Sequence, residues 1–203
     1  MAATDIVSVD PKGDVILQVN ASPQSTARSF LVSSKVLCLA SDYFVAMFNS
    51  RFAEGRRLQE EACPTITLEE DDPNAMHIIL RLLHHQHHNI ELQMDPELLA
   101  SVAIHCDKYQ CHQTLRPWAV HWCASCSKVS ASEDLGYLLL AAHLFRVPNF
   151  SQISAQASRH LQPEFGRVWK QHNVLQRLPD TLIGIYLTNT YYMPQILTNL
   201  QMH

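Results

Sequence analysis

Glycine and charge are both scarce in this sequence. The 203 residues include five glycines, and charged side chains make up 17% of the chain. Phosphate-cradling loops need glycines at short fixed spacing, so Walker and dinucleotide-binding loops are excluded. The formal net charge of −4 is not the basic excess that neutralises a phosphate backbone. The sequence therefore argues against direct binding of nucleic acid.

Long apolar runs are missing as well. No stretch approaches the roughly 18 apolar residues of a membrane span. Residues 1–10 lack the basic and apolar regions of a secretory signal. We therefore expect an intracellular, soluble protein with no membrane partner, and the sequence leaves nucleus and cytoplasm open. In that setting thiols stay reduced, so no disulfide is predicted among the six cysteines.

Apolar side chains are abundant at 47%, enough to bury a sizeable core. β-rich runs predict strands at residues 14–19 and 28–32, which read as a hairpin-like pair, and a third strand at residues 65–68. Short helices are expected over residues 33–40 and 41–49. The later chain reads as helices.

Two later helices have the same start signal, an aspartate N-cap followed by proline at the first helical position, at Asp72 and at Asp95. A small, polar stretch at residues 125–132 separates these helices from three more, over residues 135–145, 151–161 and from about 179. We predict a first domain at residues 1–125 and a helical extension at residues 126–203.

Cysteines and histidines are the candidates for chemistry. Thiolates and imidazoles at suitable spacing can complete a tetrahedral zinc site, and four cysteines lie close in sequence with His105, His112 and His121 between them. These cysteines are Cys106, Cys111, Cys123 and Cys126. Against zinc, Cys106 falls on an apolar helical stripe, a common place for a buried free thiol. A zinc-binding regulatory protein is the alternative function.

Other candidate sites have plainer interpretations. The histidines within residues 84–88 could bind a metal, but they follow a helix whose C-terminal carbonyls histidine can cap. Ser125 and Lys128 have the Ser-x-x-Lys spacing of a serine-acylating motif, but nothing else of that enzyme class is present. Phe44, Met47, Phe48 and Phe52 could line a partner groove, although such stripes usually form core. We predict no enzyme, no resident cofactor, no metal site and no small-molecule substrate.

The ordered series of motifs resembles the BTB/POZ family, in particular its fungal branch, over about residues 5–125. Residues 138–148 resemble the helical extension of such fungal proteins. The matching pieces are Asp14–Val19, Phe30–Leu37, Ser41-x-x-Phe44-x-Ala-Met-Phe48, Phe52–Gly55, Glu70–Met76, Leu80–His85, Leu98–Ala100, Asp107–Tyr109, Leu115–Ala119 and Trp122.

The resemblance implies an α+β fold, a small sheet capped by a helical cluster and followed by an all-helical C-terminal extension. It also implies a non-enzymatic protein-interaction module that forms a homodimer or a BTB heterodimer. In the family, dimers often form through the N-terminal segment and the first helices. The positions this implies as a partner interface are Ile6, Val7, Val9, Asp14, Lys35, Val36 and Leu39.

Two departures bear on that interface. The family has a buried acid at the position of Asp14, but Ser33 and Ser34 replace the histidine and basic residue often found after the second strand. Lys35 is then a candidate substitute, shifted by one residue. Some relatives recruit a cullin scaffold as ubiquitin-ligase adaptors and others regulate transcription, so an adaptor or scaffold role in either kind of assembly stays open.

Overall fold

The computed structural model describes residues 6–20, 27–86, 88, 90, 93–126 and 128–186. The chain forms two compact units. We call residues 1–91 with 101–115 the sheet unit, and residues 92–100 with 116–203 the helical unit. Among the described residues, no helix combines the length and apolar character needed to cross a bilayer.

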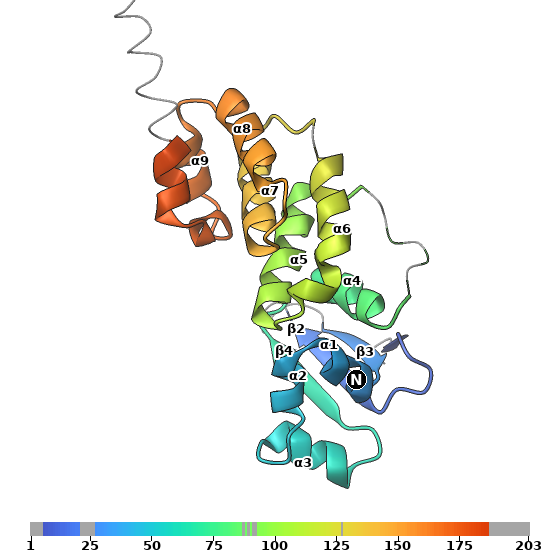
Figure 1. The fold of residues 1–203 in the computed structure, drawn as a ribbon. Coiled ribbons are helices and arrows are strands. Elements are labelled where there is room, and N and C mark those ends of the chain that lie inside the picture. The colour runs from blue at the N-terminus through green and yellow to red at the C-terminus, as the bar shows by residue number, and fades with distance from the viewer. Residues whose placement is uncertain are drawn as a thin grey trace, which may run out of the picture. The chain divides into compact units, whose positions relative to one another are not determined.

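The sheet unit contains four described strands in the order β1-β3-β2-β4 (Figure 1). They are β1 (Ile6–Ser8), β2 (Val15–Asn20), β3 (Arg28–Val32) and β4 (Thr65–Glu69). β2 and β3 pair antiparallel, with Leu17 opposite Phe30, which confirms the predicted hairpin-like pair. β1 and β4 are edge strands that run parallel to their neighbours. The sequence did not predict β1, because three residues are too few for an alternating pattern to emerge.

Short helices surround this sheet: α1 (Ser34–Ala40), α2 (Asp42–Met47), α3 (Ala53–Glu60) and α4 (Pro73–Leu83). α4 contacts β2 and β3 through an apolar face on which Met76, Ile79 and Leu80 are fully buried. As predicted, Asp72 caps α4, since its Oδ1 accepts a hydrogen bond from the N–H of Asn74 at 2.8 Å. The mixed sheet with its helices confirms the α+β fold class.

Helices α5 (Pro96–Lys108) and α6 (His112–Ser125) each contribute residues to both units. The division by contacts falls within α5 and α6, and the boundary after residue 125 stays a prediction. Residues 92–100 group with the helical unit, where Cys126 Sγ contacts Met94 O and Tyr137 Oη donates to Glu97. By contrast, the Tyr109 ring stacks on Phe44 of the sheet unit, with centroids 5.1 Å apart. These contacts cut across a boundary drawn by position along the chain.

In the helical unit, α7 (Ser132–Leu144) packs against α8 (Phe150–His160) and α9 (Phe165–Lys170) (Figure 1). A short 3-10 helix, η1 (Leu175–Arg177), and a helix over residues 180–186 follow. Every residue from Leu135 to Ala142 is buried, so α7 is covered on all sides. A helix that is apolar all round is typical of a central core helix.

Three helices end without glycine where glycine is usual. His85, Gln110 and Arg146 follow α4, α5 and α7 with φ between 51° and 56°, the left-handed region. In each case the N–H of the left-handed residue and that of the next residue bond back to the helix in the Schellman pattern, as with Gln110 to Asp107 and Cys111 to Cys106. Because none of these three residues is glycine, each turn carries backbone strain of about 1 kcal/mol.

Candidate functional site

The predicted partner residues lie on β1, on the loop before β2 and on α1 of the sheet unit. On edge strand β1, Ile6 is 48% exposed and Val7 is half-buried. On α1, Lys35 and Leu39 are exposed and Val36 is half-buried. Leu39 is 90% exposed, the largest value among the exposed large hydrophobic residues described. These residues form the accessible part of the predicted interface.

Two predicted positions are occupied within the unit itself. Val9 is 2% exposed and belongs to the core, where its N–H donates to Leu31 O. Asp14 is half-buried, and its two carboxylate oxygens accept hydrogen bonds from the N–H and the Oγ of Ser34, each at 2.7 Å. Ser34 thus provides both of these donors to Asp14. In this unit, Asp14 holds the start of α1.

The start of α1 is fixed by further polar contacts. Ser33 caps the helix, and its own N–H donates to Nε2 of His84 at 3.0 Å. The other nitrogen of that ring, Nδ1, lies 2.8 Å from Leu80 O. A neutral imidazole that donates from Nδ1 and accepts at Nε2 satisfies both contacts. Leu37 on the inner side of α1 is fully buried, so polar and apolar anchors together leave Leu39 outside.

The turn after α4 connects the two interface elements. His84 contacts Ser33 ahead of α1, and Gln86 Nε2 donates to Val9 O just after β1. Residues 84–86 therefore contact the chain just before α1 and just after β1. Burial lowers the pKa of His84 most strongly, with the neighbouring His85 acting in the same direction, while the Leu80 carbonyl and Asp10 oppose it. This histidine is an internal structural group rather than a surface ligand.

A second polar cluster ties α5 to the loop before α4. Asp71 is fully buried, and its carboxylate accepts hydrogen bonds from Lys108 Nζ at 2.7 Å and from Tyr109 Oη. His105 Nε2 lies 3.3 Å from the same carboxylate. Burial raises the pKa of Asp71, but the contacts with His105, Lys108 and Tyr109 outweigh it, so the net pKa is lowered. All the contacts are internal, which indicates a structural role.

The cysteines do not assemble a metal centre in the described part of the chain. There, no group of three or more histidine, cysteine or acidic side chains could hold a metal ion. Cys106 and Cys111 are fully buried in the sheet unit, whereas Cys123 and Cys126 are buried in the helical unit. Burial raises the pKa of Cys123 to about 12 and also raises that of Cys126. The zinc alternative therefore lacks its ligand set.

The other candidate residues occupy structural positions in the described part of the chain. His84 is internal, His85 forms the left-handed turn, and His87 lies outside the described residues. The Oγ of Ser125 donates to Trp122 O at 2.8 Å, a contact within its own helix, and Lys128 is exposed. Of the possible groove residues, Phe44 is fully buried, Met47 and Phe48 are half-buried, and Phe52 is 53% exposed. Phe44 is thus confirmed as core.

Sequence reasoning missed two features of this unit. Val45 on α2 is 48% exposed, although a valine within an apolar stretch reads as core. The second feature is the buried Asp71 cluster, which the run of four acidic residues at 69–72 does not reveal. The signal available for it was the pair Lys108 and Tyr109, but their contact with Asp71 spans 37 and 38 residues of sequence.

Comparison with known families identifies the chain. A model of the BTB/POZ domain matches residues 12–119, just over half of the sequence. Among curated proteins, none matches the chain. The matched segment contains β2 to β4 and α1 to α5, including the anchored helix that bears Leu39. BTB/POZ domains are interaction modules that are generally non-enzymatic. The sheet, its helices and the family match together place this chain in the BTB/POZ family of protein-interaction domains.

Proposed function

We propose that this BTB/POZ protein forms a homodimer through the free edge of β1 and the outer face of α1. The observation that carries the proposal is the 90% exposure of Leu39 on a helix whose start is held by Asp14, Ser33 and His84. Full burial of a leucine side chain is worth about 1.5–3 kcal/mol, which this residue does not gain in the single chain. A partner surface would supply it.

Charge and shape at these elements support a protein partner. Lys35 lies on the exposed side of α1 near Leu39, a polar rim beside an apolar centre, as in typical interfaces. Among the described strands, β1 pairs with β3 alone, so its other edge can accept a strand. Val7 is half-buried on that strand and would become fully covered by a second copy.

The test is light scattering coupled to size exclusion at micromolar concentration, with wild type beside Leu39→Asp. Wild type is expected as a dimer, and the variant is expected to dissociate at least about tenfold more readily, because a buried carboxylate would lack a partner. Phe52→Asp is the matched control, since Phe52 is also exposed and apolar but lies outside β1 and α1. A monomeric wild type would refute the homodimer, and equal dissociation of both variants would refute its assignment to β1 and α1.

We also infer a role as an adaptor or scaffold, either in a cullin-type ubiquitin ligase or in transcriptional regulation. This role would use surfaces other than β1 and α1. Exposed Val45 on α2 and Phe52 before α3 support it, because they remain available when β1 and α1 are covered. A purified cullin amino-terminal domain titrated against wild type and Phe52→Asp tests the ligase branch. Binding that Phe52→Asp weakens supports that branch, and absence of binding to wild type removes it.

The lineage and the cellular location belong to the same proposal. The series of motifs and residues 138–148 support a fungal-type BTB protein with a helical extension. The free thiols, four of which are buried, support a reducing intracellular location, in the nucleus or the cytoplasm. Imaging of a fluorescent fusion in fungal cells tests the location, and a signal confined to the cell exterior would contradict it.

A further inference from the structure

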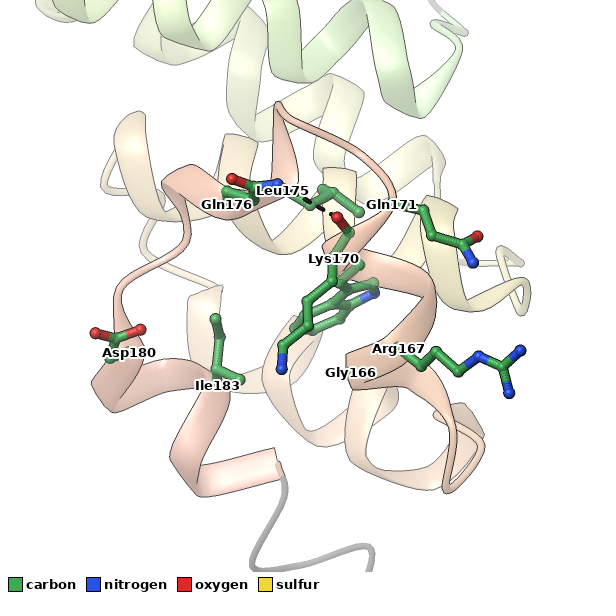
Figure 2. A pocket seen from close by; sticks show the side chains of 9 residues that line it. Gly166, Arg167, Lys170, Gln171, Leu175, Gln176, Asp180 and Ile183 are labelled. Carbon is green, nitrogen blue, oxygen red and sulfur yellow. Dashed lines mark hydrogen bonds between the residues drawn. The ribbon is translucent and has the colours of Figure 1, made fainter.

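The helical unit has a hollow that the dimer proposal does not use. It has a volume of about 870 Å³ and lies among α9, η1 and the helix over residues 180–186. Figure 2 shows Lys170 extending from α9 into the space beside Ile183, with Asp180 on the same helix as Ile183. This volume is within the range of pockets that hold ligands.

The walls of the hollow are apolar beneath a polar rim. Ile183, Leu175 and Trp169 contribute apolar surface, and Leu175 and Trp169 are themselves almost fully buried, so the base is fixed. Trp169 is held on α7 because its Nε1 donates to Ser132 O at 2.7 Å. Gln176 Nε2 donates to Lys170 O at 3.3 Å and fastens η1 to α9 (Figure 2). The hollow is therefore a preformed feature of the unit.

Positive charge dominates the rim. Arg167 and Lys170 are three residues apart on α9 and both line the hollow, Lys170 beside Ile183 and Arg167 extending outward on the far side of α9 (Figure 2). Both are exposed, and neither forms an ion pair with a described residue. Asp180 is the one carboxylate among the lining residues. Two cations beside an apolar base favour a ligand that combines carboxylates with aliphatic side chains.

We propose that this hollow, which we call the α9 groove, binds an acidic peptide segment of a partner protein. Carboxylates of the peptide pair with Arg167 and Lys170, and an aliphatic side chain covers Ile183. The Asp180 carboxylate accepts hydrogen bonds from peptide N–H groups, donors that a nucleic-acid backbone lacks. The proposal goes beyond dimerisation and does not depend on it.

The test uses the full chain and three fluorescein-labelled peptides with the same leucine and isoleucine positions. These positions alternate with glutamate and aspartate, with glutamine and asparagine, or with lysine. Fluorescence anisotropy at low salt is expected to show the acidic peptide binding at least about tenfold more tightly than the neutral one, as charge-assisted hydrogen bonds permit. Binding of the acidic peptide should weaken with added salt.

A charge-reversed pair assigns the binding to the groove. Arg167→Glu with Lys170→Glu is expected to weaken binding of the acidic peptide at least about tenfold. Lys128→Glu with Arg159→Glu makes the same change in net charge at exposed positions outside the lining, and should leave the affinity within about twofold. Circular dichroism and thermal melting of both variants check that they fold.

A third variant addresses the apolar base. Ile183→Asn is expected to weaken the acidic and the neutral peptide alike. The proposal is overturned if the acidic peptide binds no more tightly than the neutral one, if both charge-reversed pairs weaken it equally, or if a labelled single-stranded RNA of matched length binds more tightly than the acidic peptide. Failure of the homodimer test leaves these outcomes unchanged, because the groove residues all lie in the helical unit.

Discussion

The sheet unit and the helical unit stabilise their elements in different ways. In the sheet unit, polar side chains hold element ends: the buried Asp71 contacts α5, and the half-buried His84 contacts the residue before α1. In the helical unit, α7 buries eight consecutive residues, and the aromatic rings of Phe165, Trp169 and Tyr186 pack against one another. Polar anchors depend on protonation and on complete pairing, whereas apolar packing depends on filled volume.

The difference follows from what each unit has to hold. Short helices such as α1 and α2 bury few side chains, so their positions depend on capped ends and directional hydrogen bonds. α7 buries eight consecutive residues, so its position depends on apolar packing rather than on capped ends. The two units should therefore respond to different perturbations, and five substitutions test this.

The largest effect is expected from Trp169→Ala in the helical unit. The ring packs against α7 so closely that a Cβ built on Gly136 would lie 2.7 Å from Trp169 Nε1. Its removal leaves a large cavity and should lower the free energy of unfolding by about 3–5 kcal/mol. Hydrogen exchange should accelerate in α7 before it does in β2 and β3. Val168→Ala is the control, and equal acceleration in both units would contradict the contrast.

Asp71→Ala should lower the free energy of unfolding more than any other substitution in the sheet unit, by about 3 kcal/mol, because Lys108 and Tyr109 lose a buried carboxylate partner. Urea unfolding followed by hydrogen exchange at α5 measures it. Glu69→Ala removes an exposed carboxylate two residues away and should change stability by less than about 0.5 kcal/mol. Similar losses from the two variants would show that the Asp71 cluster contributes little.

The stability of the sheet unit should fall as the pH is lowered through the histidine range. The pKa of His84 is lowered in the fold, chiefly by burial, and that of His77 is lowered by burial and by Arg28 and Arg81. Below the unfolded pKa of about 6.5 the unfolded chain takes up protons that the folded chain resists, so stability decreases. Urea midpoints measured from pH 8 down to pH 5 check this.

His84→Gln is the matched variant for that pH series. At pH 8 this variant should have a free energy of unfolding about 1–3 kcal/mol below that of wild type, because the contacts with Ser33 N–H and Leu80 O are broken or weakened. Its stability should depend less steeply on pH than that of wild type. An unchanged slope would show that His84 is not a source of the pH dependence.

The smallest effects come from the left-handed turns and should be equal in the two units. Gln110→Gly in the sheet unit and Arg146→Gly in the helical unit remove strain at positive φ, and each should raise stability by about 0.5–1 kcal/mol. Gln110→Ala and Arg146→Ala keep the strain and should give no gain. Thermal melting distinguishes them, and equal midpoints for the glycine and alanine variants would contradict the prediction.

Much of the fold could be predicted because its signals are local. The starts of α4 and α5 follow from Asp72 and Asp95 with their prolines, and the alternation in residues 14–19 and 28–32 gives β2 and β3. β1 is too short for a pattern, and α9 lies in a six-residue stretch whose apolar positions make little periodicity. The boundary between the units depends on contacts between residues far apart in sequence, such as Tyr109 with Phe44.

The site was predictable only in part, for the same reason. The family resemblance points to β1 and α1, but sequence alone does not show that Val9 is internal or that Leu39 is outside. The α9 groove joins residues from three short elements separated by turns, and its cations look like ordinary surface residues in the sequence. What distinguishes them is the apolar base between those elements, which exists only in the folded unit.

The turn at residues 84–86 has a consequence for how variants of this protein combine. Because it contacts both Ser33 before α1 and Val9 after β1, a substitution there disturbs two segments at once. Changes at His84 or Gln86 should therefore be non-additive with changes on either segment, as expected for residues that share partners. Substitutions on β1 and on α1 should therefore affect each other through this turn, which lies outside the proposed interface.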